Sequence, residues 1–225
     1  YFGELGGRNR KVPTAEGDLV SHPGIMLISN IRKDGKPIGS LPDGEMMFHS
    51  DGAYAKRPFR YTLLFAIEIP SVGGNTKFAN MYKAYDALPE DLKTRLANVH
   101  AEQVYYAGSV QKDKPSDSLT GQRIHPIFTA HEETGRTSLY ASRLITTRID
   151  GLPEAESDEI LEQLCDIGER DAFVYEHVWT PGDFVMWDNR CTNHARTNFS
   201  EGERRLLRRT TVLGIDPVAA TAQAA

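Results

Sequence analysis

The stretch that decides the fold is Phe173–Trp187, which reads FVYEHVWTPGDFVMW. From Phe173 to Trp179 every second residue is aromatic, a period typical of a β-strand with one buried face. Pro181-Gly182-Asp183 has the composition of a tight turn, and Phe184–Trp187 predicts a second strand. Two short strands on either side of a turn are typical of an antiparallel all-β protein.

The same signals recur along the rest of the chain. Apolar or β-branched runs predict strands at Gly24–Ser29, Thr62–Ile69, Arg136–Ser142 and Leu206–Ile215. The near-continuous run Thr62–Ile69 favours a strand buried on both faces. Helical spacing is found at Pro89–Val99 and Pro153–Ile167. Because strands and helices do not alternate regularly, we expect a mainly β sandwich or barrel with helical inserts, and not a doubly wound α/β fold.

Composition predicts a single soluble domain over residues 1–225, with 219–225 as a frayed tail. Hydrophobic residues make up 40% of the chain and charged residues 25%, which is ordinary for a globular protein. The net charge of −5 argues against nucleic acid or an anionic membrane as the partner. Two cysteines are too few for a disulfide framework and favour a cytoplasmic setting. No apolar run is long enough for a membrane helix.

The motif Phe48-His49-Ser50-Asp51 is a candidate metal site. Side chains two apart on a strand share a face, so His49 and Asp51 could hold one ion from one strand. His194 is a second candidate ligand far downstream. Two imidazoles and one carboxylate suit a mononuclear non-haem Fe(II) oxygenase, because the open positions accept a chelating 2-oxo acid and O₂.

Other interpretations of these histidines stay open. An H-x-D tripeptide also occurs in proteins without a metal. His177 lies on the alternating strand and is expected to be packed or hydrogen-bonded, and His125 is expected in a loop before Pro126. The triad would also suit a zinc-type metallohydrolase. A non-catalytic jelly-roll binding module with a structural triad is the third possibility.

A candidate anion site follows the second histidine, in Glu203–Thr211, ERRLLRRTT. These arginines run into an apolar strand, where an unpaired guanidinium is costly and an anionic partner is expected. Arg205 and Arg209 are four apart and would share one face of the strand. A short hairpin after His194 could bring Arg205 beside the metal, where it would hold the distal carboxylate of 2-oxoglutarate. Thr76, after a Gly-Gly turn, could add a hydroxyl hydrogen bond.

Four segments carry a family resemblance that covers nearly the whole chain, from about Phe2 to Asp216. They are FHSDGAY (48–54), PSVGGNTKFANMYKAYDALPEDL (70–92), FVYEHVWTPGDFVMWDNRCTNH (173–194) and ERRLLRRTTVLG (203–214). In this order they resemble the taurine dioxygenase and dichlorophenoxyacetate dioxygenase (TauD/TfdA) family. The resemblance implies a double-stranded β-helix, or jelly roll, and a dimer or tetramer. It also implies that the first strands of the fold precede Tyr1.

The resemblance also implies roles for individual residues. His49, Asp51 and His194 would bind Fe(II). Thr76 and Arg205 would bind the distal carboxylate of 2-oxoglutarate, and Arg209 would face an anionic group of the substrate. Trp187 and Asn189 would support the strand that carries His194.

The chain departs from the two named groups on the substrate side of the site. Phe48 stands where a Trp is usual, and Gly108-Ser109 and Ile145 lack expected aromatics. The segment Leu41–Glu45 does not match the substrate loop of the taurine enzymes. The sequence therefore predicts an enzyme that uses Fe(II), 2-oxoglutarate and O₂ to hydroxylate a small anionic molecule. A carboxylate, a sulfonate or a phosphonate would fit, and succinate and CO₂ would be released.

Overall fold

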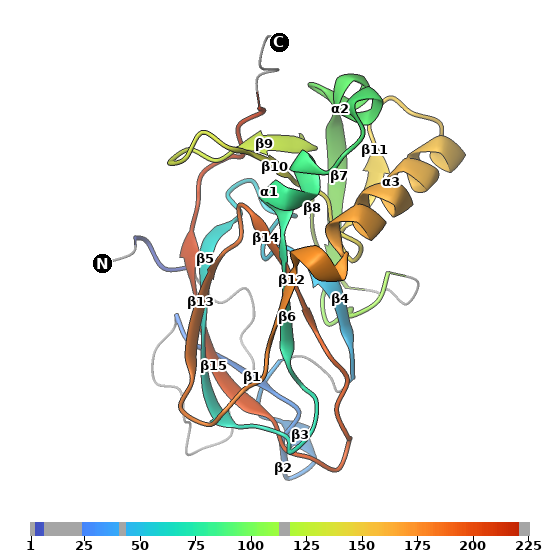
Figure 1. Cartoon of the computed structure of the whole chain (residues 1–225). Coiled ribbons are helices and arrows are strands. Elements are labelled where there is room, and N and C mark those ends of the chain that lie inside the picture. Colours follow the sequence, from blue (N-terminus) through green and yellow to red (C-terminus); the bar gives the residue numbers. More distant parts are fainter. Residues whose placement is uncertain (1–2, 7–23, 41–43, 113–117, 221–225) are drawn as a thin grey trace.

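Two four-stranded antiparallel sheets face each other in the computed structural model, which describes residues 3–6, 24–40, 44–112 and 118–220 (Figure 1). The first sheet, in the order β1-β15-β5-β13, consists of Met26–Ser29, Leu206–Leu213, Phe59–Glu68 and Phe184–Asp188. The second, in the order β12-β6-β14-β4, consists of Val174–His177, Thr76–Asn80, Thr192–Arg196 and Met46–His49. Strands that are far apart in sequence are neighbours in both sheets, as in a jelly roll, and the predicted mainly β fold is confirmed.

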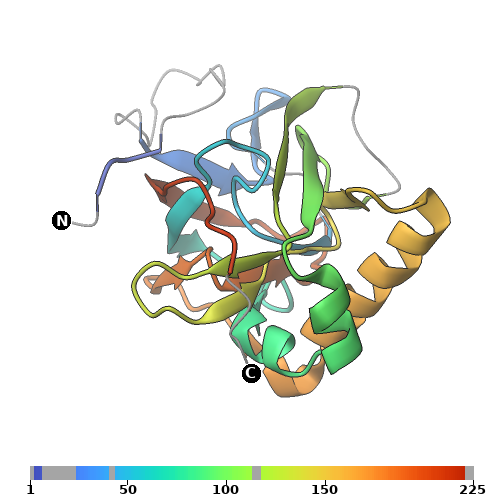
Figure 2. The same ribbon diagram turned by 90° about the horizontal axis from the view of Figure 1, so that it is seen from above.

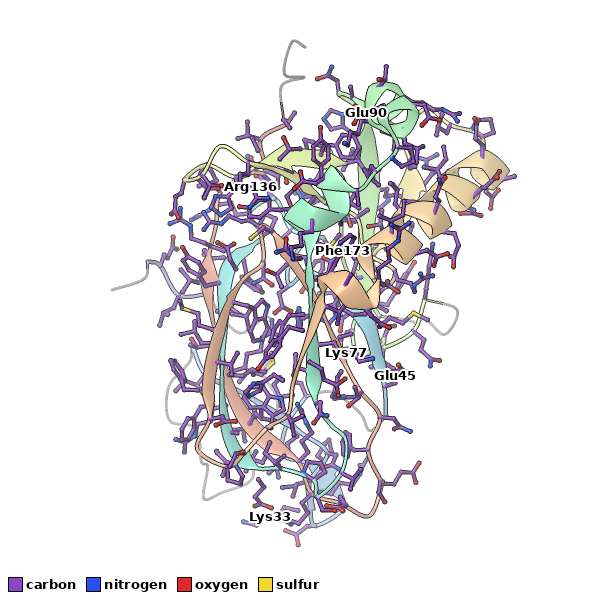
Figure 3. All side chains as sticks on the ribbon, viewed as in Figure 1. Lys33, Glu45, Lys77, Glu90, Arg136 and Phe173 are labelled. Atoms are coloured by element: carbon purple, nitrogen blue, oxygen red, sulfur yellow. The ribbon has the colours of Figure 1, made fainter. Side chains whose placement is uncertain are left out.

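The segment Phe173–Trp187 connects the two sheets. β12 belongs to the second sheet and β13 to the first, so the turn between them carries the chain across the sandwich. Gly182 lies in this turn with a φ of +96°, a conformation that favours glycine. Trp179 and Trp187, on either side of the turn, are buried in the same apolar cluster. Side chains from both sheets fill the space between them (Figure 3).

Helices and shorter strands cover one end of the jelly roll (Figures 1 and 2). The helices are α1 (Met81–Asp86), α2 (Glu90–Leu96) and α3 (Glu154–Gly168). A three-stranded sheet consists of β11 (Thr146–Ile149), β7 (His100–Tyr106) and β8 (Leu119–Pro126), and a hairpin of β9 (Phe128–Ala130) and β10 (Thr137–Leu139). The pair β2 (Arg32–Lys33) and β3 (Lys36–Pro37) is separate. The apolar faces of the helices meet in the largest core cluster, which includes Leu96, Ile160 and Leu164.

Two sequence predictions about local structure are corrected by the fold. β5 is not buried on both faces, because Phe65 on its outer face is 38% exposed. His125 lies on β8 and not in a loop, and its Nε2 is 2.9 Å from the carbonyl oxygen of Ala55. Both predicted helices form: α2 is shorter than the predicted Pro89–Val99, and α3 keeps the predicted length but begins and ends one residue later. α1 was not predicted, because its six residues are too few to show a helical period.

The C-terminal segment is paired as far as the structure describes it. Ala219 forms a β-bridge with Thr129, and the amide of Ala220 donates to the carbonyl of Phe128 at 3.0 Å. These two residues were expected to fray, and residues 221–225 of the same predicted tail lie outside the described residues. Within the described part of the chain, no helix has the length and apolar character needed to cross a bilayer.

Candidate metal centre

Three side chains that are far apart in sequence converge between the two sheets. His49 ends β4 and is the cross-strand partner of His194 on β14, and the two imidazole centroids are 4.1 Å apart. Asp51 follows in the turn after β4, with one carboxylate oxygen 3.8 Å from Nε2 of His49 and the other 3.7 Å from Nε2 of His194. The structure therefore brings all three predicted ligands together.

The backbone positions that bring His49 and Asp51 together differ from those expected. We expected His49 and Asp51 to share a face of one strand, but β4 ends at His49. Asp51 lies in the turn that follows, where Gly52 adopts a left-handed φ of +74°. The register of β4 against β14 then brings His194 to the same point.

Both histidines are neutral bases in this environment. Burial lowers the pKa of His49 and lowers that of His194 further, well below its ordinary value. Nδ1 of His49 lies 2.9 Å from the carbonyl of Met47, which can only accept, so the ring proton sits on Nδ1. The lone pair of Nε2 is consequently directed toward Asp51.

Asp51 remains an anion despite its burial. Burial alone would raise its pKa, but interactions led by the guanidinium of Arg209 outweigh that effect and bring the pKa down to about 2. Nη2 of Arg209 is 2.8 Å from Oδ1 of Asp51, and the Thr62 hydroxyl donates to Oδ2 at 2.7 Å. The predicted substrate residue Arg209 thus also contacts a candidate metal ligand.

This donor set fits a divalent first-row metal ion. Nδ1 of His194 is buried without a hydrogen-bond partner among the described residues, so the protein alone does not satisfy this ring. His49 and Asp51 are buried, and the side chain of His194 is 12% exposed. Two neutral imidazoles and one carboxylate form the three-ligand face typical of non-haem Fe(II) oxygenases. Such a face leaves further coordination positions open for small ligands.

A buried cation lies where the sequence placed the oxo-acid site. Arg205 is 3% exposed, and its Nε donates to the carbonyl of Gly74 at 3.2 Å. No described carboxylate pairs with it. Burial, reinforced by the charge of Arg196, lowers its pKa to about 9. A guanidinium in this setting requires an anionic ligand.

Thr76 is ready to donate to the same ligand. Its Oγ1 accepts from the indole nitrogen of Trp179 at 3.0 Å. Because an indole N–H can only donate, the hydroxyl proton of Thr76 is left for another acceptor. Thr76 is the cross-strand partner of Arg196 and lies two residues after Gly74, so the Gly-Gly turn brings it near Arg205.

One expectation about this region is wrong. Arg205 does not return in a hairpin after His194, since β14 and β15 belong to different sheets and the chain crosses between them. Trp187 was expected to support the strand that carries His194, and it does so from the opposite sheet, where it lies in β13 and Asn189 directly follows that strand. Trp187 packs against the His194 ring at 4.7 Å, and Asn189 accepts from the backbone N–H of Asp51 at 3.3 Å.

A second group of possible metal ligands is satisfied by the protein itself. His131, Asp188 and Cys191 lie together on the outside of the barrel near α1. Nδ1 of His131 accepts from two backbone amides, and its Nε2 is 3.2 Å from the carboxylate of Asp188. Asp188 is also paired with Arg190. Both ring nitrogens of His131 and the carboxylate of Asp188 therefore have partners within the protein. This group connects the β9–β10 hairpin to β13.

Comparisons of the sequence with known proteins point to one family. The family model described as "Taurine catabolism dioxygenase TauD, TfdA family" matches residues 2–211. The (S)-phenoxypropionate/alpha-ketoglutarate-dioxygenase of Sphingobium herbicidovorans is 36% identical over 219 residues, 89% of this chain and 76% of the relative.

Solved structures extend the likeness to the fold. A taurine dioxygenase from Burkholderia xenovorans superposes with a TM-score of 0.76 and 28% identity, over 97% of this chain and 70% of that one. AAD-2 in complex with Mn(II) and N-oxalylglycine gives a TM-score of 0.70 and 31% identity, over 77% and 70%.

Proposed function

This chain belongs to the TauD, TfdA family and is an alpha-ketoglutarate-dependent dioxygenase, and we propose that it uses Fe(II) to hydroxylate a small anionic organic molecule. Family membership removes the two alternatives that the sequence left open, the metallohydrolase and the non-catalytic module. The observation that carries the proposal is the convergence of His49, Asp51 and His194 in the same interior as the buried Arg205, which has no carboxylate partner among the described residues.

The proposed reaction consumes 2-oxoglutarate, O₂ and the substrate. 2-Oxoglutarate loses CO₂ and becomes succinate, which takes one oxygen atom of O₂. The other oxygen atom enters a C–H bond of the substrate as a hydroxyl group. Bound Fe(II) would supply the activation of O₂ that couples these two oxidations.

The residues of this chain position the reactants and exclude water. His49, Asp51 and His194 would hold the metal, and the neutral state of both imidazoles keeps their lone pairs available to it. Arg205 and Thr76 would bind the distal carboxylate of the oxo acid, with Trp179 orienting the threonine. Their burial strengthens each of these charged contacts.

Arg209 supports an anionic substrate. Its Nη2 is engaged by Asp51, but its Nε is buried and has no hydrogen-bond partner among the described residues. A carboxylate, sulfonate or phosphonate could accept from that nitrogen. The similar proteins named above act on phenoxypropionate, a carboxylate, and on taurine, a sulfonate.

The rest of the substrate would meet apolar side chains. Met46 lies on the metal-bearing strand and Ala53 in the turn after Asp51, and both are buried in a cluster with Ile145. Ile145 is one of the positions that depart from the taurine enzymes, and the departing residues 41–43 lie outside the described part of the chain. This cluster favours a substrate whose non-ionic part is hydrocarbon.

The direct test measures succinate. Purified protein is given Fe(II), ascorbate and 2-oxoglutarate, together with a panel of carboxylates, sulfonates and phosphonates, each with an apolar body. We expect succinate and the hydroxylated product in equal amounts with at least one class, and neither in a sample treated with a chelator. No succinate and no O₂ uptake under any condition would contradict the proposal.

Arg209→Leu is expected to lower kcat/KM for an anionic substrate by at least about tenfold, because a charge-assisted contact is lost. The loss should appear mainly as a higher KM for the substrate, and it should be smaller for an uncharged analogue. Arg208→Leu is the matched control, since the side chain of Arg208 points to the opposite face of β15. Equal effects of the Arg209 variant on charged and uncharged substrates would exclude Arg209 as the anion-binding residue.

A further inference from the structure

A chain of three hydrogen bonds leads from the apolar core to the carboxylate of Asp51. The indole nitrogen of Trp187 is 3.0 Å from Oδ1 of Asn189. Nδ2 of Asn189 is 2.9 Å from the hydroxyl oxygen of Thr62, and that hydroxyl is 2.7 Å from Oδ2 of Asp51. The antiparallel register of β13 on β5 creates the chain, because Trp187 and Thr62 are cross-strand partners.

The direction of every bond in this chain is fixed by Trp187. An indole N–H can only donate, so the side-chain oxygen of Asn189 must face it and the amide nitrogen must face Thr62. The Thr62 oxygen then accepts from that amide, and the hydroxyl group donates its single proton to Asp51. The backbone N–H of Asp51 closes the network by donating to the same Asn189 oxygen.

The network holds the side chain and the backbone of Asp51 at once. Oδ2 accepts from Thr62 on β5, and Oδ1 accepts from Arg209 on β15, so both oxygens are tied to the first sheet. The neighbouring Ser50 hydroxyl donates to the Asn189 carbonyl at 2.8 Å. The two imidazoles come from the opposite sheet, and the carboxylate plane is therefore set by residues that are not ligands.

We propose that Thr62 is a positioning residue for the metal centre, which fixes the orientation of the Asp51 carboxylate through a hydroxyl proton directed by Asn189 and Trp187. This inference rests on the proposed function, in which Asp51 binds the metal. Thr62 is 0% exposed in an otherwise apolar run of β5, where a hydroxyl needs a specific reason to be buried.

The test compares hydroxyl-bearing and hydroxyl-free side chains at position 62. Thr62→Val and Thr62→Ala remove the hydroxyl, and Thr62→Ser retains it. Thr211→Val is the matched control, because Thr211 is the buried partner of Thr62 on the neighbouring strand β15. Mn(II) is titrated into each protein without 2-oxoglutarate, and thermal unfolding without metal is measured in parallel.

Loss of an outer hydrogen bond to a metal ligand typically weakens metal binding by about 10- to 100-fold. We expect the dissociation constant for Mn(II) to rise by about that factor in Thr62→Val and Thr62→Ala. It should stay within about threefold of the original value in Thr62→Ser and Thr211→Val. Cobalt(II) absorption should change in the hydroxyl-free variants alone, because the ligand orientation changes.

The outcomes separate this inference from the proposed function. If the unmodified protein does not bind Mn(II), the proposed function fails. If it binds Mn(II) and the hydroxyl-free variants bind equally well, the inference fails and the function stands. Equal weakening in Thr62→Ser would assign the effect to the lost methyl group and overturn the inference. If only the hydroxyl-bearing proteins fold, the hydroxyl serves the fold and the inference is again overturned.

Discussion

Replacement of His49 by alanine is expected to abolish both Mn(II) binding and succinate formation. His49 supplies one of only two imidazoles in the candidate centre, and its Nε2 is already oriented by the Met47 carbonyl. Changes to an outer partner of a ligand cost about 10- to 100-fold in affinity, so loss of the ligand itself should cost more.

The matched control for this variant is His100→Ala, because His100 is exposed on β7 outside the core. Both proteins should unfold at similar temperatures without metal. Addition of Mn(II) should raise the unfolding temperature of the control alone, since a ligand stabilises only a native state that binds it. Full succinate production by His49→Ala would remove His49 from the metal site.

Arg205→Ala is expected to raise the 2-oxoglutarate concentration needed for half-maximal turnover by at least about 100-fold. Removing one partner of a buried ion pair costs about 3–5 kcal/mol, and each 1.4 kcal/mol is a factor of ten in affinity. Arg204→Ala is the control on the neighbouring residue, because Arg204 is exposed and pairs with Glu68 on the surface. An unchanged requirement in Arg205→Ala would show that the distal carboxylate binds elsewhere.

The same variant should be no less stable than the original protein when 2-oxoglutarate is absent. The pKa of Arg205 falls from its ordinary range to about 9 in the folded state, so folding disfavours the charged form. At pH 7 the side chain is charged in the folded and the unfolded chain, so the folded state bears the whole cost of burying the charge. Arg205→Ala removes this cost, and that gain offsets the loss of packing by the arginine stem. Thermal unfolding with and without 2-oxoglutarate would show stabilisation by the ligand in the original protein only.

The sequence predicted which residues form this site better than how the strands that carry them are arranged. The H-x-D motif, the second histidine and the arginines were singled out together, because their motifs occur in the order found in one family, and the structure brings the three candidate ligands together. The expected strand geometry of His49 and Asp51 and the expected hairpin before Arg205 were both wrong. The first depends on where β4 ends. The second depends on which strands are neighbours, and in a jelly roll neighbours are far apart in sequence.

Thr62 and Asn189 were not identified as contacts of Asp51. Their positions follow from the register of β13 against β5, which short-range periodicity does not determine. One signal was available, since Thr62 opens an otherwise apolar run in which a hydroxyl must find a partner. The sequence alone did not say what that partner would be.

The link between the two sheets also gives the protein two optical probes. The chain has two tryptophans, and they lie on either side of the turn between β12 and β13. Trp179 touches the threonine on the oxo-acid side, whereas Trp187 touches the amide that leads to Asp51. With one indole replaced by phenylalanine, the fluorescence of the other would report on a single half of the site. The arrival of metal and that of co-substrate could then be timed separately, without an attached dye.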